Sequence, residues 1–332
     1  MNNKTMDVTG IGNAIVDVIA PADDAFLADN GIEKGAMNLV DAERSNAIYE
    51  RMGSGIEMSG GSAANTIVGL AGLGGQGAFI GKVKEDSFGK VFHHDIIAAG
   101  VRFETRLSTS GPPTASCLVL VTEDAQRSMN THLGACVDLG PEDVDEDLIR
   151  ASKTIYLEGY LWDPPRAKEA FLKAAAIAYG SGGKVALSLS DPFCVGRHRE
   201  EFLQLVERHV DILFANEDEI TSLYQVSDFD SALQAVRGHC DTVALTRGAK
   251  GSVVLSGGEV HVLDAEPVDK VVDTTGAGDL YAAGFLFGYT QQMDPVRCGR
   301  LGGIAAAEII GHYGARPEAD LKALVMAALG DG

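Results

Sequence analysis

The chain has 332 residues, and 27 Lys and Arg against 47 Asp and Glu give it a formal net charge of −20. A chain this acidic is a poor general binder of nucleic acid or anionic membranes, because both are held by clustered Lys and Arg. Hydrophobic residues make up 45% and charged residues 22%, which is typical of a globular protein and excludes disorder. Glycine supplies 40 residues, above the usual share, so glycine-dependent turns are expected at specific places.

The sequence favours a cytoplasmic location. Residues 1–7 are polar and carry no apolar segment typical of a secretory signal. No apolar run reaches the length of about 18 residues that predicts a transmembrane helix. The five cysteines are scattered without a Cys-x-x-Cys pair, which favours reduced thiols over disulfides or a zinc site.

Strand-like and helix-like segments alternate along most of the chain. Strands are first predicted at 8–12 and 78–80, and helices at 62–73 and 86–99. Further strands are predicted at 154–157, 184–189, 211–214, 242–246 and 252–255. The helices between and after them are predicted at 166–179, 200–207, 218–223, 277–289, 296–310 and 318–329. This alternation is typical of an α/β protein with a mostly parallel sheet.

Two regions, 14–42 and 102–132, interrupt the alternation. They contain β-type stretches, such as 115–122 and 128–132, that no helix follows. We expect these stretches to pair as a small sheet over the carboxyl edge of the main sheet. Such a sheet would serve as a lid that excludes water from a reaction. The chain, 1–332, is then predicted to be a single domain with this lid.

The most conspicuous glycine pattern lies at residues 72–77 and matches G-x-G-x-x-G. A dinucleotide site requires a strand before this pattern and a helix after it. Here the predicted order is reversed, since a helix precedes the pattern and a strand follows. The pattern therefore predicts a helix end and a turn, which removes the main argument for an NAD-dependent oxidoreductase.

A second glycine pattern, Asp273-Thr274-Thr275-Gly276-Ala277-Gly278-Asp279, begins a helix. The free N–H groups and partial positive charge of a helix start can bind a phosphate or an oxyanion. Asp279 lies in the first helical turn, where its carboxylate can take a proton from an attacking hydroxyl. We expect the helix dipole to keep Asp279 ionised and weakly basic. The structural alternative is an ordinary helix cap followed by a first-turn aspartate.

A third glycine pattern, Ser59-Gly60-Gly61-Ser62-Ala63-Ala64-Asn65, also begins a helix. Gly60 and Gly61 would let the backbone approach a ligand, and Asn65 offers both a donor and an acceptor. Asn13 and Asp17 stand four residues apart near a strand end, and together they suit vicinal hydroxyls. Each of these residues, taken alone, is equally explained as a turn or cap residue.

Nearly the whole chain resembles the PfkB carbohydrate kinases, also called the ribokinase-like family. Its two glycine-dependent helix starts, 60–65 and 273–279, look like the two family signatures. Within the family the chain is most similar to adenosine kinases, in segments 12–17, 26–32, 187–193 and 210–217. The resemblance implies a three-layer α/β/α fold with a mostly parallel central sheet and a small β-sheet lid.

The resemblance also implies roles for individual residues. Asp279 would be the catalytic base for a 5′-hydroxyl, and the N–H groups of Gly276, Ala277 and Gly278 would form an anion hole. The ribose hydroxyls would be held by Asn13, Asp17, Gly60, Gly61 and Asn65. Glu219, with Asn216, would organise Mg²⁺ through water, and the ATP phosphates would lie along Asn216, Thr246, Arg247, Gly248 and Gly251. The alternatives are a solvent-facing helix start for Asn216 and Glu219 and a surface turn for Arg247.

A nucleobase pocket is predicted from aromatic and apolar side chains. Its candidate residues are Ile15, Leu39, Tyr160 and Phe193. Trp162 also stands where adenosine kinases carry an aromatic residue, but it is at least as well explained as a core residue. Arg127 in the lid region could contact phosphate on closure, but a plain hairpin residue is the better interpretation. Met37 stands where eukaryotic adenosine kinases tend to carry a polar residue that touches the base.

The resemblance thus implies an ATP- and Mg²⁺-dependent kinase that makes AMP from adenosine. A kinase for inosine, guanosine, ribose or fructose is the alternative of the same class. A catalytically silent nucleotide-binding or sensor protein on the same fold is the alternative of a different class. A monovalent cation such as K⁺ is a further cofactor candidate. The expected partners are small molecules, without nucleic acid or membrane, and the sequence leaves a monomer or a homodimer open.

Overall fold

The computed structural model describes residues 4–124 and 126–330; residues 1–3, 125 and 331–332 lie outside the described part, including one position of the expected lid. The main sheet has eight strands in the order β13-β12-β11-β10-β9-β8-β1-β5. Strands β1, β5 and β8 to β11 run parallel, and β12 and β13 are antiparallel at one edge. Their bounds are β1 Met6–Ile11, β5 Gly77–Ile80, β8 Ser152–Glu158, β9 Lys184–Ser188, β10 Ile212–Asn216, β11 Thr242–Thr246, β12 Ser252–Ser256 and β13 Glu259–Leu263.

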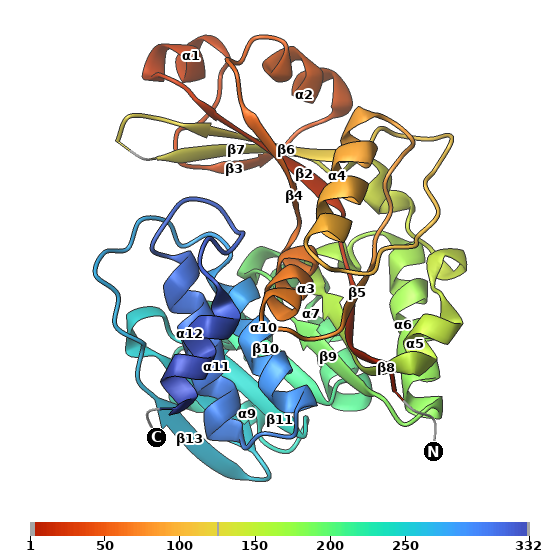
Figure 1. Ribbon diagram of the computed structural model, residues 1–332, viewed down its shortest axis with the longest axis vertical. Coiled ribbons are helices and arrows are strands. Elements are labelled where there is room, and N and C mark those ends of the chain that lie inside the picture. Colours follow the sequence, from red (N-terminus) through yellow and green to blue (C-terminus); the bar gives the residue numbers. More distant parts are fainter. Residues whose placement is uncertain (1–3, 125, 331–332) are drawn as a thin grey trace.

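Helices cover both faces of this sheet, as Figure 1 shows, and the expected three-layer α/β/α fold is confirmed. Central strands such as β1 are buried at every position because both faces are covered. One face packs against α5 Glu146–Ala151, α6 Pro165–Gly180, α7 Pro192–His209, α8 Glu217–Tyr224 and α9 Phe229–Val236. The other packs against α3 Ser62–Gly72, α10 Ala277–Thr290 and α11 Pro295–Ile309, and α12 Leu321–Gly330 packs on the outside of these helices. No helix in the described residues is long and apolar enough to cross a membrane.

A second, five-stranded sheet lies above the main sheet in Figure 1, with the order β3-β7-β6-β2-β4. Its strands are β2 Ile15–Pro21, β3 Met37–Leu39, β4 Ile56–Gly60, β6 Ala115–Val121 and β7 Arg127–His132. Strand β4 lies outside both predicted lid regions and pairs antiparallel with β2. Helices α1 Asp24–Asp29 and α2 Ala42–Tyr49 bury the outer face of this sheet, and α4 Ser87–Ala98 lies beside it.

Several predicted helix boundaries need correction. The helix expected at 200–207 is α7, which begins at Pro192 because the Asp191 carboxylate caps it by accepting from Cys194 N at 2.6 Å. The last helix begins at Leu321, three residues later than expected, because Asp320 accepts from Ala323 N at 3.0 Å. Short 3₁₀ turns at Gly134–Asp138, Pro141–Asp143, Gly159–Trp162 and Gly248–Lys250 complete the connections.

The turn predicted at residues 72–77 is confirmed. Helix α3 ends at Gly72, and strand β5 begins at Gly77. The glycine pattern between them joins a helix to a strand, so it does not have the strand-to-helix order of a dinucleotide site.

Candidate active site

The site residues converge at the carboxyl ends of the parallel strands, on the side that faces the small sheet. Asn13 follows β1, Glu158 ends β8, Asn216 ends β10 and Thr246 ends β11. Open α/β sheets bind ligands at this edge, because loops there leave the strand ends and helix starts exposed together.

The start of α10 brings Asp279 to this edge. Gly276 caps the helix with a φ of +79°, and a Cβ at this position would lie 2.8 Å from the Cβ of Ala315. Only glycine fits both the left-handed backbone and the close approach. The N–H of Ala277 donates to Thr274 O at 3.2 Å, so one of the three predicted anion-hole donors is already used within the turn.

The Asp279 carboxylate contacts the other glycine-dependent helix start. Ser62 Oγ donates to it at 2.6 Å and Asn65 Nδ2 at 2.9 Å. Burial raises the pKa of Asp279, and the bonds from Ser62 and Asn65 and the charge of Arg316 only partly offset this. The expectation of a weakly basic group at this helix start is therefore wrong, because burial raises the pKa of the carboxyl.

The side chain of Asn65 can accept one further hydrogen bond. Its Nδ2 is committed to Asp279, while its Oδ1 is buried and has no hydrogen-bond partner in the described residues. A buried carbonyl oxygen without a partner is costly, and a ligand hydroxyl would satisfy it. Oδ1 is thus the atom through which Asn65 would make its predicted contact with the substrate.

Asp17 lies on the inner face of the small sheet, opposite the turn at Gly60 and Gly61. A Cβ at Gly60 would collide with the Asp17 carboxylate, and one at Gly61 would collide with Asn13 O. Gly61 also has a φ of +99°, which side chains rarely tolerate. Burial raises the pKa of Asp17 to about 6, against the lowering effect of Arg316 and Arg127.

Glu158 is a functional residue that sequence reasoning missed. Its carboxylate accepts from Asn13 Nδ2 at 2.6 Å and from Ala63 N at 2.8 Å, so it fixes Asn13 against the start of α3. Burial raises the pKa of Glu158 to about 7. The only signal in the sequence was a carboxylate at the carboxyl end of a buried strand.

Ser62 and Arg316 were also missed. Ser62 lies inside a recognised motif, so its contact with Asp279 could have been considered. Arg316 follows α11, and its side chain donates to Ser59 O at 2.7 Å and to Ala64 O at 3.3 Å. Nothing in the sequence near Arg316 indicates this contact with a segment about 250 residues away.

The residues predicted to contact the nucleobase differ in their exposure and in their contacts. Tyr160 is 38% exposed, and burial, followed by the charges of Asp191 and Asp279, raises its pKa, so it lies near the carboxylates of the site. Phe193 is 80% exposed in the first turn of α7. Trp162 is buried against Phe171 and Phe202, and its Nε1 donates to Glu201, so the core interpretation is correct.

The apolar candidates lie on the small sheet. Ile15 is half-buried on β2, two residues before Asp17. Leu39 and Met37 on β3 are 61% and 50% exposed. Apolar side chains this exposed on a strand fit a surface that a ligand covers.

On the ATP side, Asn216 and Glu219 form a reciprocal helix cap. Glu219 N donates to Asn216 Oδ1 at 2.8 Å, and Asn216 Nδ2 donates to Glu219 Oε1 at 2.6 Å. Burial, and to a smaller extent the like charges of Asp191, Asp218 and Asp279, raises the pKa of Glu219 to about 7. The described residues contain no group of three or more metal-binding side chains. This excess of negative charge without a protein cage fits Mg²⁺ held mainly through water and phosphates.

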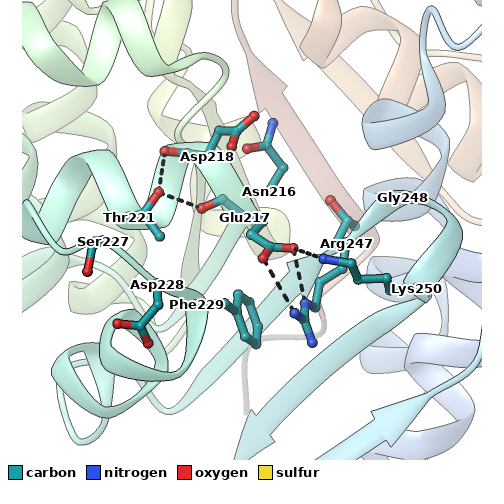
Figure 2. Close-up of a pocket in the computed structure, with 11 residues that line it drawn as sticks. Asn216, Glu217, Asp218, Thr221, Ser227, Asp228, Phe229, Arg247, Gly248 and Lys250 are labelled. Carbon is teal, nitrogen blue, oxygen red and sulfur yellow. Dashed lines mark hydrogen bonds and ion pairs between the residues drawn. The ribbon is translucent and has the colours of Figure 1, made fainter.

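A cleft of about 570 Å³ lies beside this cap and is lined by α8, the start of α9 and the end of β11; Figure 2 shows its lining residues. Thr246 and Gly248 line it as predicted. The Arg247 guanidinium lies 3.9 Å from the centre of the Phe229 ring and pairs with Glu217 at 3.2 Å. Arg247 also lines the cleft, and these contacts show that it is not a plain surface turn. Its contact with the ATP phosphates stays a prediction.

Gly251 does not line this cleft but closes the turn beneath it. Its carbonyl oxygen accepts from Arg247 N at 2.8 Å. The residue therefore shapes the segment that carries Thr246, Arg247 and Gly248.

Arg127 connects the small sheet to the glycine turn before α10. Its Nη1 forms an ion pair with Asp273 and also donates to Thr275 Oγ1 at 2.9 Å. The expectation of a plain hairpin residue is therefore wrong. This contact could not be predicted, because nothing in the sequence indicates that β7 lies beside residues 273–275.

The comparisons with known proteins agree with this geometry. A family model described as pfkB family carbohydrate kinase matches residues 40–321. The chain is similar to the adenosine kinase of Sinorhizobium meliloti, with 53% identity, a TM-score of 0.90 and coverage of 98% of this chain and 99% of that one. It is also similar to a probable sugar kinase from Rhizobium etli CFN 42, with 50% identity, a TM-score of 0.91 and coverage of 99% of both chains. The adenosine kinase of Saccharomyces cerevisiae is 28% identical over 313 residues, which cover 87% of this chain and 90% of the relative.

The matched region contains both glycine-dependent helix starts and Asp279, so the resemblance first drawn from those motifs is confirmed. The half-buried carboxylate beside a helix start suits transfer of a phosphoryl group to a hydroxyl. The chain belongs to the pfkB family of carbohydrate kinases, enzymes that transfer phosphate from ATP to a hydroxyl group.

Proposed function

We propose that this kinase acts on nucleosides and phosphorylates the 5′-hydroxyl of adenosine to give AMP and ADP. The observation that carries the proposal is the Asp279 carboxylate, which Ser62 and Asn65 hold at the start of α10. The likeness to the Sinorhizobium meliloti adenosine kinase, at 53% identity over nearly the full length, supports adenosine as the acceptor.

In the proposed reaction, Asp279 accepts the proton of the 5′-hydroxyl as the hydroxyl oxygen bonds to the γ-phosphorus of ATP. The bond from that phosphorus to the β-γ bridging oxygen breaks, and ADP leaves. N–H groups at the start of α10 stabilise the charge on the transferred group. The raised pKa makes Asp279 a better proton acceptor than an exposed aspartate.

The acceptor would be oriented by the opposite side of the site. Asp17 offers carboxylate oxygens to two vicinal ribose hydroxyls, and Asn65 Oδ1 is free to accept a further hydroxyl. Asn13 is held for this task by Glu158. Mg²⁺, organised by Glu219 and Asn216 through water, would neutralise phosphate charge.

We further propose that the small sheet is a lid, and that Arg127 exchanges Asp273 for phosphate oxygens when ATP is bound. The ion pair from β7 to Asp273 supports this, because it already spans the gap between the small sheet and the phosphate-side turn. Hydrogen exchange in the absence and presence of adenosine tests the lid. Residues 14–60 and 102–132 should gain more protection than the helices after residue 290, and equal protection everywhere would contradict a lid.

A second acceptor class is favoured by one observation. The exposed face of β3 carries Met37 and Leu39. These side chains can pack against the face of a base but cannot form hydrogen bonds that distinguish the polar groups of one base from those of another. Inosine and guanosine are therefore candidate acceptors beside adenosine. The similarity to a probable sugar kinase keeps ribose and fructose as further alternatives.

A coupled ADP-release assay with a panel of acceptors tests the proposal. Adenosine should have the highest kcat/KM, and 5′-deoxyadenosine should bind competitively without being phosphorylated. A much higher kcat/KM for ribose or fructose than for every nucleoside would overturn the nucleoside assignment. The same assay with and without K⁺ tests the monovalent-cation candidate.

A further inference from the structure

Arg316 lies in the connection between α11 and α12 and takes no direct part in the proposed reaction. Its Nε and Nη2 donate to Ser59 O at 3.0 and 2.7 Å, Nη2 also donates to Ser59 Oγ at 2.8 Å, and Nη1 donates to Ala64 O at 3.3 Å. All of these acceptors are uncharged. Within the described chain, no carboxylate forms an ion pair with Arg316 at contact distance.

The positive charge of Arg316 is nevertheless surrounded by carboxylates. Burial lowers the pKa of Arg316 to about 10, and the charges of Asp17, Asp95 and Asp279 oppose this shift. Removing a guanidinium from water is costly unless nearby negative charge compensates for it. Two of the three compensating groups, Asp17 and Asp279, are the proposed hydroxyl-binding residue and the proposed base.

The same connection supports both glycine-dependent turns. Gly314 N donates to Asp273 Oδ2 at 3.0 Å, and Ala315 packs against Gly276 at the start of α10. Arg316, the next residue, holds Ser59 at the end of β4 and Ala64 in the first turn of α3. Ser59 is also held from the opposite side, because its N–H donates to Asp95 Oδ2 at 2.7 Å.

We propose that Arg316 is a positioning residue, which fixes the two glycine turns relative to each other and keeps Asp17 and Asp279 ionised in a site that excludes water. This inference rests on the proposed function, in which Asp17 binds the acceptor and Asp279 deprotonates it. The guanidinium makes the contacts to Ser59 and Ala64, whereas its charge acts on the two carboxylates over a longer range. The two contributions can therefore be separated by substitution.

Other charged and titratable groups also face the two carboxylates. Asp279 is faced by Asp17 from β2, Tyr156 and Glu158 from β8, Tyr160 from the 3₁₀ turn at Gly159–Trp162 and Glu219 from α8. Asp17 is faced by Arg127 from β7 and Cys117 from β6. Arg316 is the cation common to both carboxylates, so its removal should raise the pH at which the site becomes active.

The test compares Arg316→Gln with Arg316→Lys in the pH profile of kcat/KM, measured with the best acceptor of the panel. In Arg316→Gln the acid limb should move up by about one pH unit or more, because an opposite charge is lost. In Arg316→Lys the limb should stay near the wild-type position, while kcat falls at least tenfold because Lys cannot reproduce the paired bonds to Ser59. Arg150→Gln, a surface substitution on α5, is the matched control.

An acid limb that moves by the same amount in both variants, or in neither, would overturn the proposal. A second readout does not depend on turnover or on the acceptor. The free energy of unfolding of the ligand-free Arg316→Gln protein should fall more steeply between pH 5 and pH 8 than that of the wild type, and an equal slope would count against the proposal. A wild type that phosphorylates no acceptor would refute the proposed function alone, because the unfolding comparison still tests Arg316.

Discussion

Asp17→Asn should make the ligand-free protein more stable and less active. Burial raises the pKa of Asp17 from 3.8 to about 6, so the folded state binds this proton more tightly than the unfolded chain. The free energy of unfolding therefore falls as pH rises from about 4 to about 6. Above that range, the ionised carboxylate costs the folded state up to about 3 kcal/mol, since a pKa that is higher by one in the folded state corresponds to about 1.4 kcal/mol.

Replacing the carboxylate with an amide removes this cost. At pH 8 the variant should be more stable than the wild type by up to about 3 kcal/mol, which for a chain of this length corresponds to a rise in Tm of roughly 4 °C. At pH 4 the two proteins should be nearly equal. The loss of a charged acceptor for the substrate hydroxyls should lower kcat/KM for adenosine by about 100-fold, because such hydrogen bonds contribute about 1.5–3 kcal/mol each.

Thermal unfolding of the ligand-free proteins at pH 4, 6 and 8 measures the stability difference, and the ADP-release assay measures the activity. Asp29→Asn, at an exposed position at the end of α1, is the matched control and should change neither property. A variant that is less stable than the wild type at pH 8, or whose stability gain is the same at pH 4 and pH 8, would refute the reasoning.

Three further predictions follow from individual contacts. Because burial raises the pKa of Asp279, kcat/KM should begin to decline with falling pH above the range of an exposed aspartate, and a pH-independent rate down to pH 4 would contradict this. Gly61→Ala should lower both kcat/KM and Tm, since its φ of +99° and its contact with Asn13 O exclude a Cβ; unchanged kinetics would show that the turn can adapt. Trp162→Phe should lower stability by about 1–2 kcal/mol through loss of the bond to Glu201, with little change in KM for adenosine; a large rise in KM would return Trp162 to the nucleobase pocket.

Much of the fold could be predicted because its signals are local. Buried runs such as those of β1 and β10 indicate strands covered on both faces, and the two glycine-dependent turns mark the starts of α3 and α10. The small sheet was anticipated from β6 and β7, whereas β4 was missed because it has only five residues and its last two, Ser59 and Gly60, were assigned to the glycine turn before α3. The starts of α7 and α12 depend on the caps at Asp191 and Asp320, which look like ordinary loop residues in the sequence.

The site was harder to predict where it depends on contacts between distant segments. Arg316 reaches Ser59, and Arg127 reaches Asp273, across separations that no local pattern records. The pKa of Asp279 was expected to be low from its place at a helix start, but it is set by the elements that bury it. For the same reason the sequence could not tell that Phe193 is far more exposed than Tyr160, at 80% against 38%.

The role of Asp279 is tested most directly by measuring turnover and adenosine binding on one preparation of Asp279→Asn. We predict a kcat lower by at least about a thousandfold, because the amide cannot accept the proton, with a Kd for adenosine within a few-fold of wild type. A variant that retains near wild-type kcat, or that loses adenosine binding as completely as turnover, would contradict the assignment of Asp279 as the base.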